Sequence, residues 1–131
     1  MAATTPPTEI VTKESSRSVG KTVERFVDLL SEKDVKVFTV IDQREEAQRV
    51  GLDLRETVLV LFGNPRAGTP VMVASPLVAL ELPLRIVIWS DNGQTKVSYE
   101  SPISLGTRYQ LAQELVGRLE GINSLTDALV A

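Results

Sequence analysis

Residues 84–100 constrain the fold of this chain more than any other segment. Two runs rich in β-branched and aromatic residues, LRIVIWS and TKVSYE, lie on either side of the sequence DNGQ. Asn-Gly is the strongest short-range signal for a hairpin, because both residues adopt the positive φ angles of a type I′ turn at low cost. The chain is therefore predicted to form an antiparallel pair of strands, to which further strands are added.

Three other segments have the apolar, β-branched composition of strands. Together with the hairpin arms, the predicted strands are residues 10–15, 35–42, 56–63, 84–90 and 95–100. Residues 56–63, ETVLVLFG, are the most apolar of these, so this strand is expected near the centre of the sheet.

Apolar residues recur at helical spacing in two longer segments. The first begins after Ser18, whose hydroxyl suits an N-cap, and continues to about Lys33. The second covers residues 104–121 and is expected to end at Gly121. The residues after it are expected to add one more helical turn or to fray.

Two shorter helical segments are expected between the strands. Asp42 suits the N-cap of a short helix that ends before Gly51. Residues 69–83 are expected to form two helical turns that cross over the sheet, with a break at Pro76. This order of elements predicts an α+β protein with a single-layer, mostly antiparallel sheet of about five strands and two long helices on one face.

Length and composition predict one soluble domain. Residues 10–131 are expected to form the domain, and residues 1–9, MAATTPPTE, to be a disordered lead-in without the features of a secretory signal. The net charge is −3 and the basic residues are scattered, so nothing favours binding to nucleic acid or to an anionic membrane. The apolar runs are too short to span a bilayer, and a cytoplasmic protein is expected.

The chain has neither histidine nor cysteine. A disulfide, a thiolate nucleophile, a cysteine-zinc site and a Ser-His-Asp triad are therefore excluded. The commonest general base at neutral pH and the commonest transition-metal ligand are both missing. No catalytic residue, metal site or cofactor is predicted.

The segment LFGNPRAGTP, residues 61–70, has the glycine spacing of a phosphate-binding loop. A Walker A loop needs Lys and then Ser or Thr after its second glycine, but Thr69 and Pro70 follow Gly68 here. A nucleotide site is therefore rejected in favour of a tight turn that needs two glycines. Thr69 and Pro70 are expected to be the N-cap and first residue of the next helical turn.

The free N–H groups of that turn suggest a small-ligand site. They are suited to bind a small anion or a carboxylate, with Asn64 and Thr69 nearby and Arg66 assisting. A pure turn is favoured over such a site, because most turns of this kind bind nothing.

Two acidic residues lie beside predicted strands. Asp42 ends one strand and Glu81 precedes another, so the pair is suited to proton transfer if the two strand ends converge. Tyr99 and Arg108 would then position a substrate. The favoured interpretation is simpler: Asp42 caps a helix and Glu81 is a solvated turn residue.

Two further pairings are expected to be structural. Trp89 and Tyr99 lie on the two hairpin arms and are candidates for a cross-strand pair. Arg108 is expected to form an ion pair with Glu100 or Asp42.

Taken together, four segments of the chain resemble the DUF302 family, a domain of unknown function. They are VFTVIDQREEAQRVGLDL, LVLFGNPRAGTPVM, SPLVALELPLRIVIWSDNGQTKVSYESP and LGTRYQL. The resemblance implies a TATA-binding-protein-like fold with a curved antiparallel sheet backed by helices, and a dimer. It also marks three departures, since the family usually has histidine where this chain has Gln43 and Tyr109, and an L-D-L-P pattern where it has Glu81.

The leading hypothesis is a non-catalytic homodimer that binds a small polar or anionic ligand at the GNPRAGTP segment. The alternatives are an enzyme that uses Asp42 or Glu81 as general acid-base, and a scaffold or protein-interaction module. The candidate ligand-binding residues are Asp42, Asn64, Arg66, Thr69, Glu81, Tyr99 and Arg108.

Overall fold

The computed structural model describes residues 8–131, which are built on one five-stranded sheet. Every neighbouring pair of strands is antiparallel, in the order β1–β5–β4–β3–β2. The strands are β1 (Ile10–Ser15), β2 (Lys36–Asp42), β3 (Thr57–Gly63), β4 (Leu84–Asp91) and β5 (Gln94–Glu100). The predicted α+β fold with an antiparallel sheet is confirmed. The apolar strand β3 has neighbours on both sides, although β4 is the middle strand.

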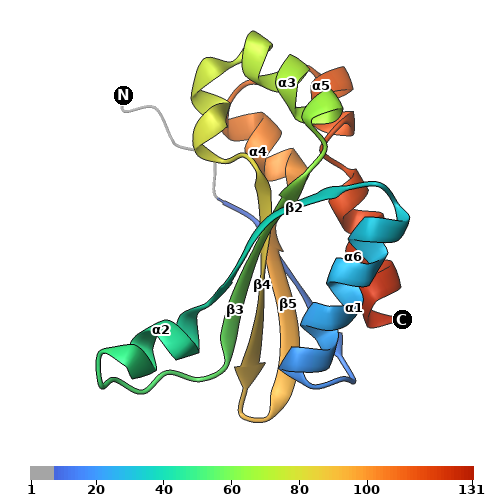
Figure 1. Ribbon diagram of the computed structural model, residues 1–131. Helices are drawn as coiled ribbons and strands as arrows, with labels where there is room; N and C mark the ends of the chain where they lie inside the picture. Colours follow the sequence, from blue (N-terminus) through green and yellow to red (C-terminus); the bar gives the residue numbers. More distant parts are fainter. Residues whose placement is uncertain (1–7) are drawn as a thin grey trace.

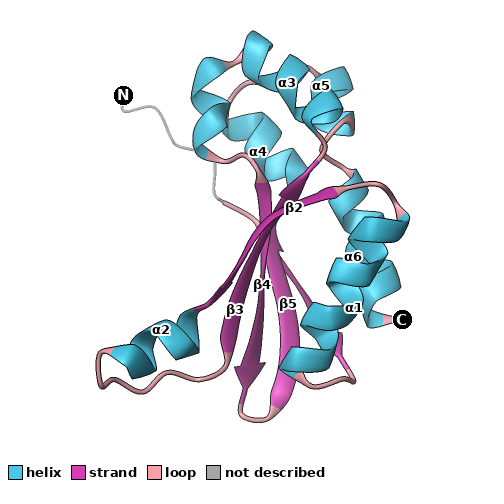
Figure 2. Ribbon diagram, in the orientation of Figure 1, coloured by secondary structure: helices cyan, strands magenta, loops and turns pink. Residues whose placement is uncertain are grey.

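The helices are distributed unevenly around this sheet. They are α1 (Val19–Glu32), α2 (Gln43–Arg49), α3 (Pro65–Ala74), the 3₁₀ helix η1 (Pro76–Leu80), α4 (Pro102–Arg108), α5 (Gln113–Gly117) and α6 (Gly121–Val130). In Figure 1, α1 and α6 lie side by side against one face, while α3, α4 and α5 gather at the upper end. Helix α2 projects from the lower end, away from α1. Within residues 8–131, Figure 2 shows no helix covering the other face.

Among residues 8–131, no helix combines the length and the apolar character that crossing a bilayer requires.

The main core lies between the sheet and α1 with α6. Successive side chains of a strand point to opposite faces, and the buried residues of β3 and β4 alternate along each strand and face the helices, including Val60 and Ile88. Phe26 of α1 meets Phe62 of β3 edge to face, with ring centroids 5.0 Å apart. Both rings are almost fully buried. The apolar stripe on α1 therefore fixes the helix layer on the sheet.

A second, smaller core lies at the upper end of the sheet. There Val71 of α3, Val78 of η1, Leu105 of α4 and Leu119 pack together. Leu84, the first residue of β4, contacts both cores and joins them.

Several local signals have the expected structure. Asn92 and Gly93 have φ angles of 51° and 89° at the β4–β5 turn. Ser18 is the N-cap of α1, Asp42 is the N-cap of α2, and Gly51 has a φ of 78° after α2. At these positions the sequence preference and the tertiary structure agree.

The expected helix over residues 104–121 is wrong. The chain forms α4, turns at Gln110 with a φ of 53°, and bonds the Leu111 N–H back to the Gly106 carbonyl at 2.8 Å. Val116 of α5 then packs on Gly106, where a Cβ atom would lie 2.4 Å from its Cγ2. Gly121 begins α6 instead of ending a helix. The second long helix on the sheet is therefore formed by residues expected to add a single turn or to fray.

The expected start of the next helical segment is also wrong. Asn64 and Pro65 are the N-cap and first residue of α3, so Thr69 and Pro70 lie inside the helix. The break before Pro76 occurs as expected. Because β3 and β4 are adjacent antiparallel strands, α3 and η1 connect them at the end of the sheet and do not cross over it (Figure 1).

The first strand and the last helix are tied together. The Lys13 ammonium of β1 donates to the Asn123 carbonyl at 3.1 Å and to the Thr126 hydroxyl at 2.7 Å, and lies 2.8 Å from Asp127. The partial burial of this ammonium opposes its charge, but Asp127 and Tyr99 outweigh that effect and raise the pKa of Lys13. The bonds hold α6 against the edge of the sheet.

The expected disordered lead-in, residues 1–9, lies mostly outside the described residues. Glu9 is described and makes two hydrogen bonds near α4: its N–H donates to the Ser104 hydroxyl at 3.0 Å and its carbonyl accepts from the Ser101 N–H at 2.9 Å.

Candidate functional site

A groove of about 540 Å³ opens where α3 faces the start of α6 across the ends of β3 and β4. This size lies within the range of small-molecule sites, roughly 300–1,000 Å³. The walls are mainly apolar, and β2 and the segment before β4 also contribute to them. The lining residues include Phe38, Phe62, Met72, Leu82, Ile122 and Leu125. The groove lies between the two cores, where the helices at the upper end of the sheet (α3, α4 and α5) meet the layer formed by α1 and α6.

The two glycines of the GNPRAGTP segment leave room for this groove. Neither has a positive φ, so neither is required by turn geometry. A Cβ on Gly68 would lie 3.6 Å from the Leu82 Cδ1, and a Cβ on Gly63 would lie 3.9 Å from the Phe38 Cε2. The expectation of a turn that needs two glycines is therefore wrong, because the missing side chains provide space beside apolar walls.

The expected anion site on free N–H groups is not present at the start of α3. Pro65 has no N–H, the Arg66 N–H donates to the Asn64 Oδ1 at 2.9 Å, and the N–H groups of Ala67 and Gly68 each donate to the Asn64 carbonyl at 2.9 Å. These bonds occupy the first N–H groups of the helix. Arg66 is exposed and is not part of the groove wall.

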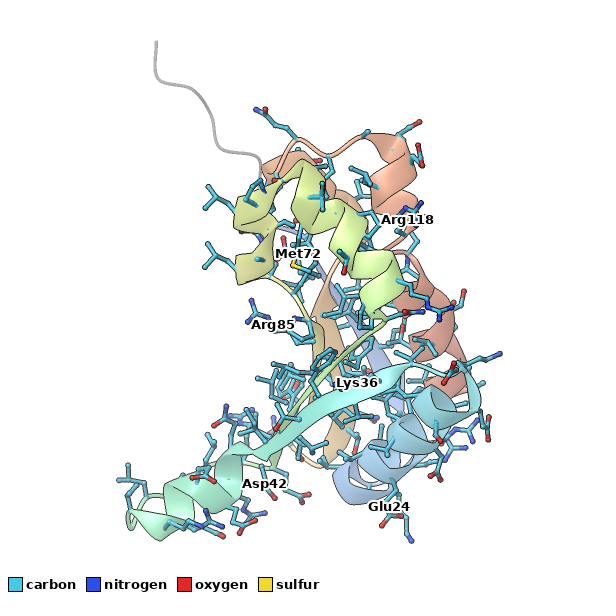
Figure 3. All side chains as sticks on the ribbon, turned by 45° about the horizontal axis from the view of Figure 1, so that its top comes forward. Glu24, Lys36, Asp42, Met72, Arg85 and Arg118 are labelled. Atoms are coloured by element: carbon cyan, nitrogen blue, oxygen red, sulfur yellow. The ribbon has the colours of Figure 1, made fainter. Side chains whose placement is uncertain are left out.

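Three polar residues do line the groove: Asn64, Thr69 and Arg118. Arg118 is the C-cap of α5, and its guanidinium lies 3.8 Å from Glu114, whose side chain is 83% exposed. Such a long, solvated ion pair contributes little. Figure 3 shows Arg118 on the α5–α6 segment and Met72 on α3. Arg118 was not predicted, since a continuous helix would make it a surface residue of a last turn.

A second cluster of polar residues lies at the same end of the sheet. Arg108 donates to both carboxylate oxygens of Glu100, at 2.7 and 3.0 Å, and lies 3.2 Å from Glu81. Glu81 also accepts from the Tyr109 hydroxyl and from Arg85, each at 2.9 Å. The expected pairing of Arg108 with Glu100 is present, and Glu81 is an ion-paired residue instead of a solvated one.

The chemistry of this cluster does not suit proton transfer. Burial alone would raise the pKa of Glu81, but Tyr109 and Arg108 outweigh burial and hold the pKa below its usual range. Burial and the bond to Glu81 raise the pKa of the Tyr109 hydroxyl. A general acid-base is most effective when its pKa lies near the working pH, and both shifts move away from neutrality.

Asp42 and Tyr99 lie apart from this cluster. Asp42 caps α2 at the opposite end of the sheet, and Figure 3 shows it far along the molecule from Arg85. Tyr99 is buried on the helix-covered face and donates to the Asn123 Oδ1 at 2.7 Å. The shared cleft that an enzyme using Asp42 and Glu81 requires is therefore absent from the described residues.

Trp89 and Tyr99 also do not pair. Trp89 lies on the other face of the sheet, where its Nε1 donates to the Ser98 hydroxyl at 3.0 Å. Among residues 8–131, no three acidic side chains gather as they would around one metal ion.

Comparison with known proteins gives both sequence and structural relatives. The sequence model of the family described as "Domain of unknown function DUF302" matches residues 11–129. A crystal structure of an uncharacterized conserved DUF302 protein from Bacillus stearothermophilus superimposes with a TM-score of 0.79 at 24% identity, covering 92% of this chain and 94% of that one. The expected family and fold are thus both confirmed.

Two curated relatives are proteins named Fluoride-specific ion channel FluC 1, from Brucella suis biovar 1 (strain 1330) and Brucella abortus biovar 1 (strain 9-941). Each is 36% identical to this chain over 103 residues, or 78% of it. The match spans only 41% and 38% of the length of these two relatives.

Proposed function

We propose that this chain, which belongs to DUF302, a family described only as a domain of unknown function, binds a small amphipathic anion in its groove. The ligand has an apolar body that fills the groove and one carboxylate or similar group that pairs with Arg118. The observation that supports this proposal most directly is an apolar groove with one weakly paired guanidinium in its wall.

The walls of the groove favour a ligand with more apolar surface than a simple polar anion has. Small-molecule sites are typically apolar with a few polar groups that fix orientation, and Asn64, Thr69 and Arg118 are such groups here. The earlier expectation of a small polar or anionic ligand is thus narrowed, and the charge partner becomes Arg118 in place of Arg66.

Binding is favoured over catalysis at this position. No acidic residue lines the groove within the described part of the chain, and the sequence has no histidine or cysteine. The groove therefore has no group that suits a general base or a nucleophile near neutral pH.

Octanoate, octanol and acetate are the probes that separate the two parts of this proposal. Octanoate has both an apolar chain and a charge, octanol has only the chain, and acetate has little more than the charge. Isothermal titration of the full chain is expected to show octanoate binding more tightly than either of the others. A charged hydrogen bond contributes about 1.5–3 kcal/mol, so Arg118→Gln should weaken octanoate binding by roughly 10- to 100-fold and leave octanol unchanged.

Gly68→Leu tests the apolar part of the site. The new side chain starts beside Leu82 and fills the groove, so octanoate and octanol should both lose affinity. Gly20→Leu, on α1 with no heavy atom within 4 Å of the added Cβ, is the matched control, and Arg49→Gln is the control for lost charge. Unchanged octanoate affinity in Gly68→Leu would disprove the proposed location, and equal losses for octanol and octanoate in Arg118→Gln would disprove the role of Arg118.

The proposed functional unit is a homodimer. The sheet is covered by helices on one face, and several large apolar residues elsewhere are exposed, as expected for a surface that contacts another chain. Light scattering coupled to size-exclusion chromatography tests the dimer by giving the mass of the particle in solution.

A further inference from the structure

The face of the sheet opposite α1, here called the open face, has an apolar centre. Leu59 and Leu61 of β3 and Val87 and Trp89 of β4 alternate with residues buried against the helices, so they point to the open face. Leu59 and Val87 are direct cross-strand partners. All four are partly accessible, so the centre of the open face presents apolar surface to solvent.

Two of the cations around this apolar centre are paired within the chain. Arg85 donates to Glu81 at 2.9 Å, and Lys96 donates to Asp91 at 2.7 Å. A second protein that covers these two cations would therefore enclose ion pairs.

An arm extends from one end of the open face. It consists of α2 and the segment that leads to β3, residues 43–56, and none of the α2 residues is buried. Val50, Leu52 and Leu54 in the arm are 72%, 63% and 40% exposed. Figure 1 shows the arm projecting from the lower end of the sheet on the side away from α1, which is the side of the open face.

An apolar patch lies at the other end of the sheet. Leu77 and Leu80 of η1, which form this patch, are 70% and 72% exposed. In Figure 1 the yellow-green segment that contains η1 lies at the upper left, on the same side of the molecule as the arm. The exposed apolar residues of the arm and the η1 patch therefore flank the open face at opposite ends.

We propose that a second copy of this chain covers the open face, with the arm of each copy lying against the η1 patch, Leu77 and Leu80, of the other. A two-fold axis that runs across the strands, between the two sheets, puts the lower end of one copy over the upper end of its partner. Both arms then meet both patches at once, which gives a closed dimer with two identical contacts. This inference names the surface used and rests on the homodimer in the proposed function.

The area of the surface agrees with this arrangement. Five strands spaced about 4.8 Å apart, each with six to eight residues of roughly 3.3 Å, give a face of roughly 550 Å². A standard interface buries about 800 Å² on each partner. The open face alone falls short of that value, so the arm and the patch are needed to complete a stable interface.

Cysteine cross-linking tests the arm–patch contact directly, because the natural chain has no cysteine. The full-length variants Leu52→Cys and Leu80→Cys are prepared separately, mixed in equal amounts and oxidised. A covalent dimer is expected from the mixture, and much less from either variant alone, since the arm lies against the patch and not against the other arm.

Acidic substitutions test whether the contact contributes to assembly. Leu52→Glu and Leu80→Glu should each raise the dimer dissociation constant by at least roughly 100-fold, measured by sedimentation equilibrium. Val40→Glu is the matched control, because Val40 is 43% exposed and pairs with Val60, whose side chain faces the helices. Circular dichroism checks that each variant is folded.

The outcomes separate the surface from the dimer itself. A dimer that neither cross-links in the mixture nor weakens in both glutamate variants would overturn the proposed surface and leave the homodimer standing. A wild-type monomer at all concentrations would overturn both. Octanoate binding is measured independently, so its result changes neither conclusion.

Discussion

Gly106 is the residue whose replacement gives the sharpest test of the structure. In a helix, alanine is normally more stable than glycine by about 1 kcal/mol. Here the added Cβ would lie 2.4 Å from the Val116 Cγ2, well inside the roughly 3.5–4.0 Å that carbon atoms prefer. Val116 must move by more than about 1 Å, and its β-branched side chain has few alternative rotamers.

Overpacking of a buried site costs about 1–3 kcal/mol, which exceeds the gain in helix propensity. We therefore expect Gly106→Ala to lower the free energy of unfolding by about 1–2 kcal/mol. With a urea m-value of about 2 kcal/mol/M, the midpoint should fall by roughly 0.5–1 M. Far-UV circular dichroism at one fixed protein concentration measures this shift.

Two further variants check the cause. Gly20→Ala in α1, where the new Cβ meets nothing within 4 Å, should raise the free energy of unfolding by about 0.5–1 kcal/mol. Gly106→Ala should cost less in a Val116→Ala background, because the colliding methyl groups are gone. If Gly106→Ala were as stable as the wild type, the proposed contact between α4 and α5 would be refuted.

Three other substitutions have defined outcomes. Folding lowers the pKa of Glu81 from its ordinary value of 4.5, so its contribution to stability is present above pH 4.5 and is lost as the pH falls through the folded-state pKa. The melting temperature of Glu81→Gln should therefore fall less steeply than that of the wild type as the pH is lowered below 4.5. The same pH dependence in both proteins would contradict the ion-paired Glu81. Phe26→Ala removes a fully buried ring from its contact with Phe62 and should cost about 3–5 kcal/mol in urea unfolding; a cost below about 1 kcal/mol would argue against that packing. Asn64→Ala removes the N-cap of α3 and should cost about 0.5–2 kcal/mol, whereas Asn64→Asp should retain most of the stability.

Much of the fold could be predicted because local preference and tertiary packing agree. The Asn92-Gly93 turn has the positive φ angles that its sequence favours, and Ser18 caps α1 where the apolar stripe begins. The apolar runs that predicted strands are the ones whose alternate residues form the core. In these segments no distant contact overrides the local signal.

The division of residues 104–130 could not be predicted from periodicity. Gln110 takes a left-handed conformation that glutamine rarely adopts, and no neighbouring residue marks it as a turn. The need for Gly106 is set by Val116, which reaches it only after the chain has turned back. An apolar spacing of three and four residues is equally consistent with one long helix and with two short ones.

The candidate site was predicted only in part. Asn64 and Thr69 do line the groove, since the GNPRAGTP segment lies at its edge. Arg118 was missed because its place in the wall depends on the break between α4 and α5. The pairing of Glu81 with Arg108 joins residues from two separate connections, and no local pattern indicates such a contact.

The hydrogen bonds of Lys13 determine which parts of the protein unfold together. It joins β1 to α6 across more than a hundred residues of sequence, with bonds to Asn123 and Thr126. When α6 detaches, the edge strand loses the side-chain bonds that hold it to the helix layer. The backbone amides of β1 and α6 should therefore exchange with deuterium at a common rate, as one cooperative unit formed by the first strand and the last helix.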